Sequence, residues 1–224
     1  MVGDGKKPPL HMPDVSQVLI MNHFIVEIKM KKALVLVLLL NMVIFGCATT
    51  QKIALNKDIR ILNISVSENV IVPKDIYYVG GGAAFGLIGG AANISPAKAF
   101  QEYTVKNGID IKDIVRNTFI ETFKETSKYS YSENAKHQIN LEVKVYGVSK
   151  KSMFSDEYEP VLLIQAEMID EAKKIIWKNG HYIQPLGNPI APVPMEKIME
   201  DPEVLRKLWR DSARAASIKI LEQL

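Results

Sequence analysis

The amino-acid sequence predicts an α+β fold, in which an antiparallel sheet of about four strands carries two amphipathic helices on one face. Apolar residues alternate with polar ones from Ile139 to Val145, which is typical of a half-buried strand. They recur every three or four residues in Ile111–Ser127 and again after Asp201, which is typical of a helix with one buried face. Elements with a single apolar face bury it by packing in layers, so a two-layer sandwich is expected.

Alternation and apolar runs mark the strands of this predicted sheet. The first strand precedes the helices, and a short extended piece, Val70–Val72, follows it. The other three form a meander between the helices, and Asn179-Gly180 is expected to end or kink the last of them. The predicted strands are Ile59–Val66, Ile139–Val145, Val161–Met168 and Lys174–Lys178.

The two predicted helices have recognisable boundaries. Ile111–Ser127 presents its apolar residues on one face and stops at a Tyr-Ser-Tyr-Ser run. The last helix starts at Asp201, whose side chain can cap it, with Pro202 at the first helical position. Before it, four prolines between Pro185 and Pro194 predict a stiff extended loop, either a plain surface crossing or a strip that binds a partner.

A different pattern lies near the N-terminus. Lys31 and Lys32 precede an apolar run, Ala33–Phe45, which ends at Gly46 and Cys47. The run is shorter than the ~20 residues that a helix needs to cross a bilayer. A positive start, a short apolar core and a small residue before the cut are typical of a secretory signal peptide.

Ile44-Phe45-Gly46-Cys47 resembles the lipobox of bacterial lipoproteins, although Phe45 stands where a smaller residue is commoner. The resemblance implies that the sulfur of Cys47, the single cysteine of the chain, takes a diacylglycerol and that Cys47 becomes the mature N-terminus. Several acyl chains on one residue would anchor the protein durably. The alternative is that Cys47 is a small buried hydrophobe at the end of a core helix.

The same resemblance implies a location. Residue 48 is alanine rather than the aspartate that retains enterobacterial lipoproteins in the inner membrane. The expected location is therefore the periplasmic face of the outer membrane, with the inner membrane as the less favoured alternative.

These observations divide the chain into segments. Residues 1–29 are interpreted as an upstream extension from a misassigned start codon, with a genuine cytoplasmic extension as the alternative. Residues 30–46 form the signal peptide, 47–58 a tether, and 59–224 a single periplasmic α+β domain. Basic and acidic residues nearly balance after Cys47 and form no basic patch, so nucleic acid is not an expected partner.

A glycine-rich insert, 76–97, contains no charged residue. Gly82, Gly86 and Gly90 are spaced four apart, so on a helix they would form a close-packing face. We consider three interpretations: a self-associating or membrane-inserted glycine zipper, a loop ordered only against a partner, and a buried core helix. A dinucleotide-binding loop is excluded because Phe85 occupies the position of its last glycine.

No pattern in the sequence indicates catalysis. His137 and His181 lie outside any metal-ligand spacing, so we expect no catalytic residues, no metal and no cofactor besides the lipid on Cys47. The order of elements weakly resembles small periplasmic accessory lipoproteins, such as those that assist lipopolysaccharide assembly, and the N-terminal domain of the Tol translocation protein.

The leading hypothesis is therefore a non-enzymatic outer-membrane lipoprotein that serves as an assembly, transport-accessory or scaffold component. Its expected partners are the membrane, through the anchor, and an envelope protein of unknown identity. A periplasmic carrier of a small lipid or glycan is the alternative, and an envelope hydrolase is less favoured.

Overall fold

The computed structural model describes residues 52–56, 59, 61–80, 95–185 and 187–224. All of them belong to one compact unit, Thr50–Leu224. The signal peptide, Cys47 and the three spaced glycines Gly82, Gly86 and Gly90 lie outside the described residues. The predictions made for them therefore stay predictions.

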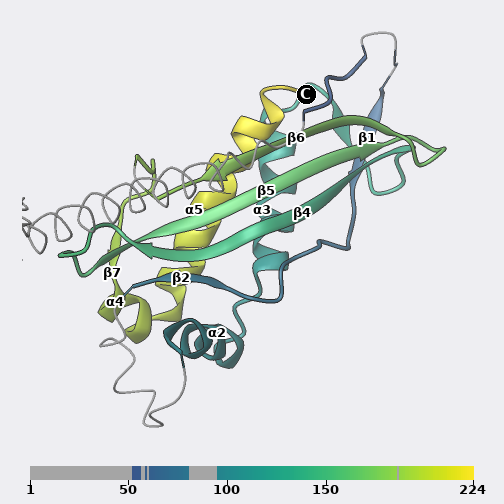
Figure 1. Cartoon of the computed structure of the whole chain (residues 1–224). Helices are drawn as coiled ribbons and strands as arrows, with labels where there is room; N and C mark the ends of the chain where they lie inside the picture. Colours follow the sequence, from purple (N-terminus) through teal and green to yellow (C-terminus); the bar gives the residue numbers. More distant parts are fainter. Residues whose placement is uncertain (1–51, 57–58, 60, 81–94, 186) are drawn as a thin grey trace, which may run out of the picture. The chain divides into compact units, whose positions relative to one another are not determined.

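The described part is α+β, as predicted, but its sheet is mixed and larger than expected (Figure 1). The long hairpin of β4 and β5 forms its centre, and the strand order is β3-β1-β4-β5-β6. In addition, β2 pairs with β4 and β7 pairs with β5. The strands are β1 Asn63–Val66, β2 Tyr77–Val79, β3 Ser130–Tyr131, β4 His137–Lys150, β5 Glu157–Ile169, β6 Ile175–Ile183 and β7 Val193–Pro194.

The prediction of a purely antiparallel, four-stranded sheet is wrong because β1 and β2 run parallel to β4. Ile64 lies opposite His137, Ile71 forms an isolated bridge to Glu142, and Tyr77 lies opposite Gly147. The segment from β1 to β2 thus follows β4 as one interrupted strand, and β3 pairs with β1 on its other side. A helical crossover separates it from β4 in the sequence, which is the connection that parallel strands require.

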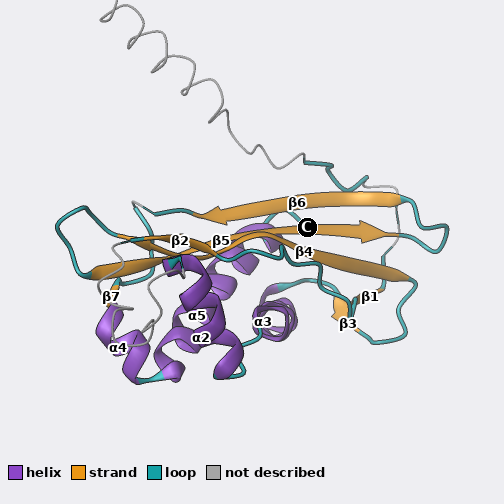
Figure 2. Cartoon of the chain, turned by 60° about the horizontal axis from the view of Figure 1, so that its bottom comes forward, coloured by secondary structure: helices purple, strands orange, loops and turns teal. Residues whose placement is uncertain are grey.

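Helices α2 to α5 cover one face of the sheet (Figure 2). The expectation of two helices is corrected to four in the described part, namely α2 Pro96–Lys106, α3 Ile111–Thr126, α4 Met195–Glu200 and α5 Pro202–Leu221. The two predicted helices match α3 and α5. The N-terminus of α2 carries the same signal as α5: the Ser95 hydroxyl accepts from the Lys98 amide at 3.3 Å, and Pro96 follows the cap.

Large side chains fill the layer between the helices and the sheet. Trp177 from β6 and Trp209 from α5 are both buried, and each indole N–H finds a backbone carbonyl, of Gln223 and Gly147 respectively, at 3.2 Å. Buried indoles keep their polar atom satisfied in this way. Further aromatic residues in the layer are Phe100, Phe119 and Phe123.

Strand β6 continues through Asn179-Gly180, where the sequence predicted an end or kink. The side chain of Asn179 is buried against α5 and donates its amide to the carbonyl of Ile220 at 2.9 Å. Packing against the helix and pairing with β5 therefore override the local turn preference of these two residues.

Candidate functional site

The outer face of the sheet, defined as the face opposite the helices, is identified by alternation along the strands. Trp177 and Asn179 of β6 point to α5, so Lys178, Gly180 and Tyr182 belong to the outer face. Their partners on β5 are Glu167, Gln165 and Leu163. Figure 2 shows this face free of the four helices.

One half of the outer face carries a network of polar side chains. Lys178 contacts Glu167 at 2.6 Å, and the amide of Gln165 donates to the same carboxylate at 2.8 Å. On β4, Lys144 contacts Glu142 at 2.5 Å. Because the Lys178–Glu167 pair is largely shielded from water, it is screened less than the ion pairs at the protein surface.

The other half of the outer face is apolar and aromatic. Tyr78 of β2 points inward, where its hydroxyl lies 3.0 Å from that of Tyr158, so its neighbours Tyr77 and Val79 face outward and are exposed. Tyr182 of β6 is also exposed, and partial burial together with the nearby Tyr77 raises its pKa. On the helix side of the sheet, burial raises the pKa of the Tyr78 hydroxyl far above its ordinary value, and the hydrogen bond with Tyr158 adds to this effect.

The described chain begins at the edge of β6, a few residues after Cys47. Ile53 and Lys178 exchange two backbone hydrogen bonds, of 2.9 and 3.0 Å. Lys52 reaches the side chain of Gln223, just after α5, at 3.5 Å. The described part of the predicted tether, residues 52–56, is thus attached to the sheet rather than separate from it.

His137 and His181, the two histidines of the described part, lie in different places, and the structure does not bring them together. His181 is partly buried on the helix side of β6; burial, and then the charges of Lys219 and Lys52, lower its pKa. His137 begins β4 and lines a shallow hollow with Asn134 and Lys136. No group of histidine, cysteine or acidic residues that could hold a metal ion occurs among the described residues.

The hollows found in the described part lie at the surface. One, of about 350 Å³, is bordered by α2, the α2–α3 turn and Tyr146. Another, of about 330 Å³, lies between α3 and α5 and presents both signs of charge, from Asp113, Glu121, Arg206 and Arg210. The acidic residues come from α3 and the arginines from α5, so only the packing of the two helices brings them into one hollow.

The short turn between β4 and β5 was not predicted from the sequence. The segment 149–159 reads as a polar loop, but the two strands extend into it and leave a short turn. Met153 and Phe154 stand at its tip, 85% and 96% exposed. The signal that could have revealed them is the Met-Phe pair itself, placed between serines where a polar turn is expected.

In the described part, no helix is long and apolar enough to cross a membrane. The described part is an α+β domain with helices on one face of a mixed sheet and a polar and aromatic surface on the other face. No protein-family model matches it, and no curated protein matches it in sequence.

Solved structures similar to this chain include the following three. A Xanthomonas campestris protein of family DUF330 has a TM-score of 0.41 and 7% identity, over 76% of this chain and 88% of its own. A PelC dodecamer from Paraburkholderia phytofirmans has a TM-score of 0.29 and 13% identity, over 74% and 94%. Lipoprotein GNA1162 from Neisseria meningitidis has a TM-score of 0.25 and 14% identity, over 65% and 97%. None of these similarities assigns a family or a function.

Proposed function

We propose that this chain is a lipid-anchored accessory protein of the bacterial envelope that acts by binding rather than by catalysis. Cys47 is the proposed site of acylation, and the periplasmic face of the outer membrane is the proposed location. The lipid on Cys47 is its only proposed prosthetic group.

The observation that carries the proposal is the short link between the lipobox and the folded domain. Cys47 precedes Ile53 by six residues, and Ile53 is hydrogen-bonded to β6. Six residues span at most ~20 Å, at about 3.3–3.6 Å each. A cysteine acylated at this position would hold the domain at the membrane surface, where an accessory protein would work.

The charged hollow between α3 and α5 supports a protein partner. It combines Arg206 and Arg210 with Asp113 and Glu121, so a partner would have to match both signs of charge. Complementary charge patterns of this kind favour specific protein recognition. A polyanion such as nucleic acid would instead bind a surface of uniformly positive charge.

A carrier of a small lipid or glycan is the second candidate, and the interior supports it less well. Such ligands occupy deep cavities that are mostly apolar. Here Trp177, Trp209 and three phenylalanines fill the layer where a cavity of that kind would lie. The short link to the anchor would also keep a carrier from crossing the periplasm.

The test is Cys47→Ser in the full-length gene, with metabolic labelling by palmitate and separation of the inner and outer membranes. The unaltered protein should incorporate label and sediment with the outer membrane. The variant should remain unlabelled and soluble while keeping the same circular dichroism spectrum. An unlabelled wild-type protein, or equal labelling of both, would refute the anchor, and labelled protein in the inner membrane would refute the location.

A further inference from the structure

The turn between β4 and β5 presents the most exposed large apolar side chains of the described residues. Phe154 is 96% exposed and Met153 is 85% exposed. Isolated exposed hydrophobic residues are ordinary, but two adjacent ones at the tip of a long hairpin form a small apolar end. The turn therefore offers a contact for an apolar phase or partner.

Hydrogen bonds hold this tip in a defined conformation. The amide of Lys151 donates to the carbonyl of Glu157 at 3.0 Å, and the ammonium of Lys151 contacts the carboxylate of Glu157 at 3.0 Å. The amide of Ser155 donates to the carbonyl of Ser152 at 3.3 Å, and the Ser155 hydroxyl accepts from the amide of Glu157 at 3.0 Å. A turn closed in this way presents its apolar side chains without a large ordering cost.

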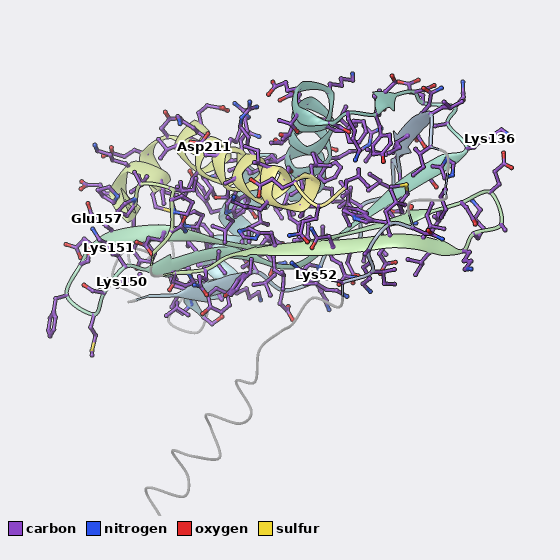
Figure 3. All side chains as sticks on the ribbon, turned by 90° about the horizontal axis from the view of Figure 1, so that it is seen from above. Lys52, Lys136, Lys150, Lys151, Glu157 and Asp211 are labelled. Carbon is purple, nitrogen blue, oxygen red and sulfur yellow. The ribbon has the colours of Figure 1, made fainter. Side chains whose placement is uncertain are left out.

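The tip of the hairpin bends away from the helix layer. Figure 2 shows the β4–β5 turn bending away from the helix layer. In Figure 3, Lys150, at the base of the turn, lies on the side opposite α5, which carries Asp211. The described chain begins at the edge of the same sheet, where Ile53 pairs with β6.

These two points are also far apart along the sheet. Ile53 pairs with Lys178, which lies opposite Glu167 of β5, and Glu157 at the hairpin end is ten residues away on the same strand. At about 3.3 Å per residue, this separation is roughly 33 Å. Two contacts so far apart along the sheet limit the orientations in which the domain can lie on a plane.

We propose that the β4–β5 tip inserts into the interfacial region of the bilayer that holds the anchor. Phe154 and Met153 enter the boundary between headgroups and acyl chains, and Lys150 places its ammonium group among the lipid phosphates. Tyr77 and Tyr182, on the same outer face, have the amphipathic form that suits a membrane interface. The outer face then turns to the membrane, and the helices with their charged hollow turn to the periplasm.

We choose the bilayer as the partner of the β4–β5 tip because the chain before the described residues contains Cys47, the proposed site of acylation. This part of the proposal rests on the proposed function: with Cys47 acylated, six residues keep the domain beside an apolar phase at all times. A protein that covers Phe154 is the alternative outcome of the test.

The experiment places a tryptophan at the tip of the lipidated protein, expressed from the full-length gene. Phe154→Trp is reconstituted into vesicles of phosphatidylethanolamine and phosphatidylglycerol whose acyl chains carry bromine, which quenches indole emission on contact. The native Trp177 and Trp209 are 1% and 0% exposed and supply a constant background. Val105→Trp is the matched control, because Val105 is 75% exposed on α2 within the helix layer.

The Phe154→Trp protein should lose most of its added emission in brominated vesicles and shift its emission to shorter wavelength, while Val105→Trp should change in neither respect. Equal quenching of both variants, or of neither, would overturn the insertion of the tip. Protection of the indole introduced by Phe154→Trp from aqueous acrylamide, without quenching by bromine, would also overturn it, and would indicate a second protein copy on the tip.

Flotation of the same vesicles separates this proposal from the anchor. Protein that floats but shows no quenching of the indole at the tip contradicts the tip contact alone and leaves the anchor intact. Protein that does not float contradicts the anchor, and with it the two-point attachment.

Discussion

The indole nitrogen of Trp209 donates a hydrogen bond of 3.2 Å to the carbonyl oxygen of Gly147. This bond joins α5 to β4 at the position where β4 also pairs with Tyr77 of the interrupted strand. Gly147 has φ of 152°, and a Cβ atom placed on it would collide with the carbonyl of Tyr77. A helix, a central strand and an edge strand therefore meet at a residue that has to be glycine.

Gly147→Ala should lower the free energy of unfolding by about 1–3 kcal/mol, the usual cost of a strained backbone conformation or an overpacked site. The collision is with main chain, so relaxation would displace β2. Chemical denaturation of the variant and the unaltered protein measures the difference.

Gly108→Ala is the control for this prediction. Gly108 also has a positive φ, of 60°, but nothing lies within 4 Å of the added Cβ. Its effect should reflect the left-handed conformation alone, about 1 kcal/mol. An equal or larger effect at Gly108 than at Gly147 would mean that the contact with Tyr77 does not matter.

Ile53→Pro should release the start of the domain from β6 without unfolding it. Proline removes the N–H that Ile53 donates to Lys178, at a cost of about 0.5–1.5 kcal/mol for one hydrogen bond. The amide of Lys178, which donates back to Ile53, should then exchange its hydrogen faster.

Hydrogen exchange followed by mass spectrometry gives this readout, with Ile53→Val as the control because valine keeps the N–H. Unchanged protection of Lys178 in the proline variant would show that the first described residues are not attached to the sheet in solution.

His181 should make the protein less stable at mildly acidic pH. Burial and the cations Lys219 and Lys52 lower its pKa below the ordinary value of 6.5, so the folded state disfavours the protonated ring, although Glu222 acts in the opposite direction. Its contribution to stability is complete above pH 6.5 and is lost as the pH falls through the lowered pKa of the folded state.

Thermal unfolding of wild type and His181→Gln above and below that range checks this prediction. The melting temperature of the wild type should fall more steeply on acidification, since glutamine takes up no proton. Parallel curves for the two proteins would exclude His181 as the cause.

Local sequence patterns were sufficient for α3, α5 and the hairpin strands β4 and β5. In α3 and α5 the apolar residues lie on one helical face, and Asp110 and Asp201 cap them by accepting from backbone amides two residues on. In β4, Ile139, Leu141 and Val143 are buried at alternate positions. In these elements the buried face is the one that the apolar periodicity predicts, so tertiary packing agrees with the local pattern.

Short elements escaped the sequence analysis because their stability comes from neighbours. Strands β2, β3 and β7 have two or three residues each, too few to show alternation, and exist because a longer strand offers hydrogen bonds. α4 has six residues and little periodicity of its own, and buried Met195 and Ile198 fix it to the core.

The sequence by itself determined the α+β class, the main amphipathic helices and the lipobox-like pattern at Cys47, because each depends on residue types at fixed short spacing. Only the tertiary structure decided that β1 and β2 run parallel to β4, that Ile53 joins β6, and that the β4–β5 tip exposes Met153 and Phe154 on the face away from the helices. These features depend on which distant segments pair and on which way a turn bends. Periodicity along the chain carries no information about either.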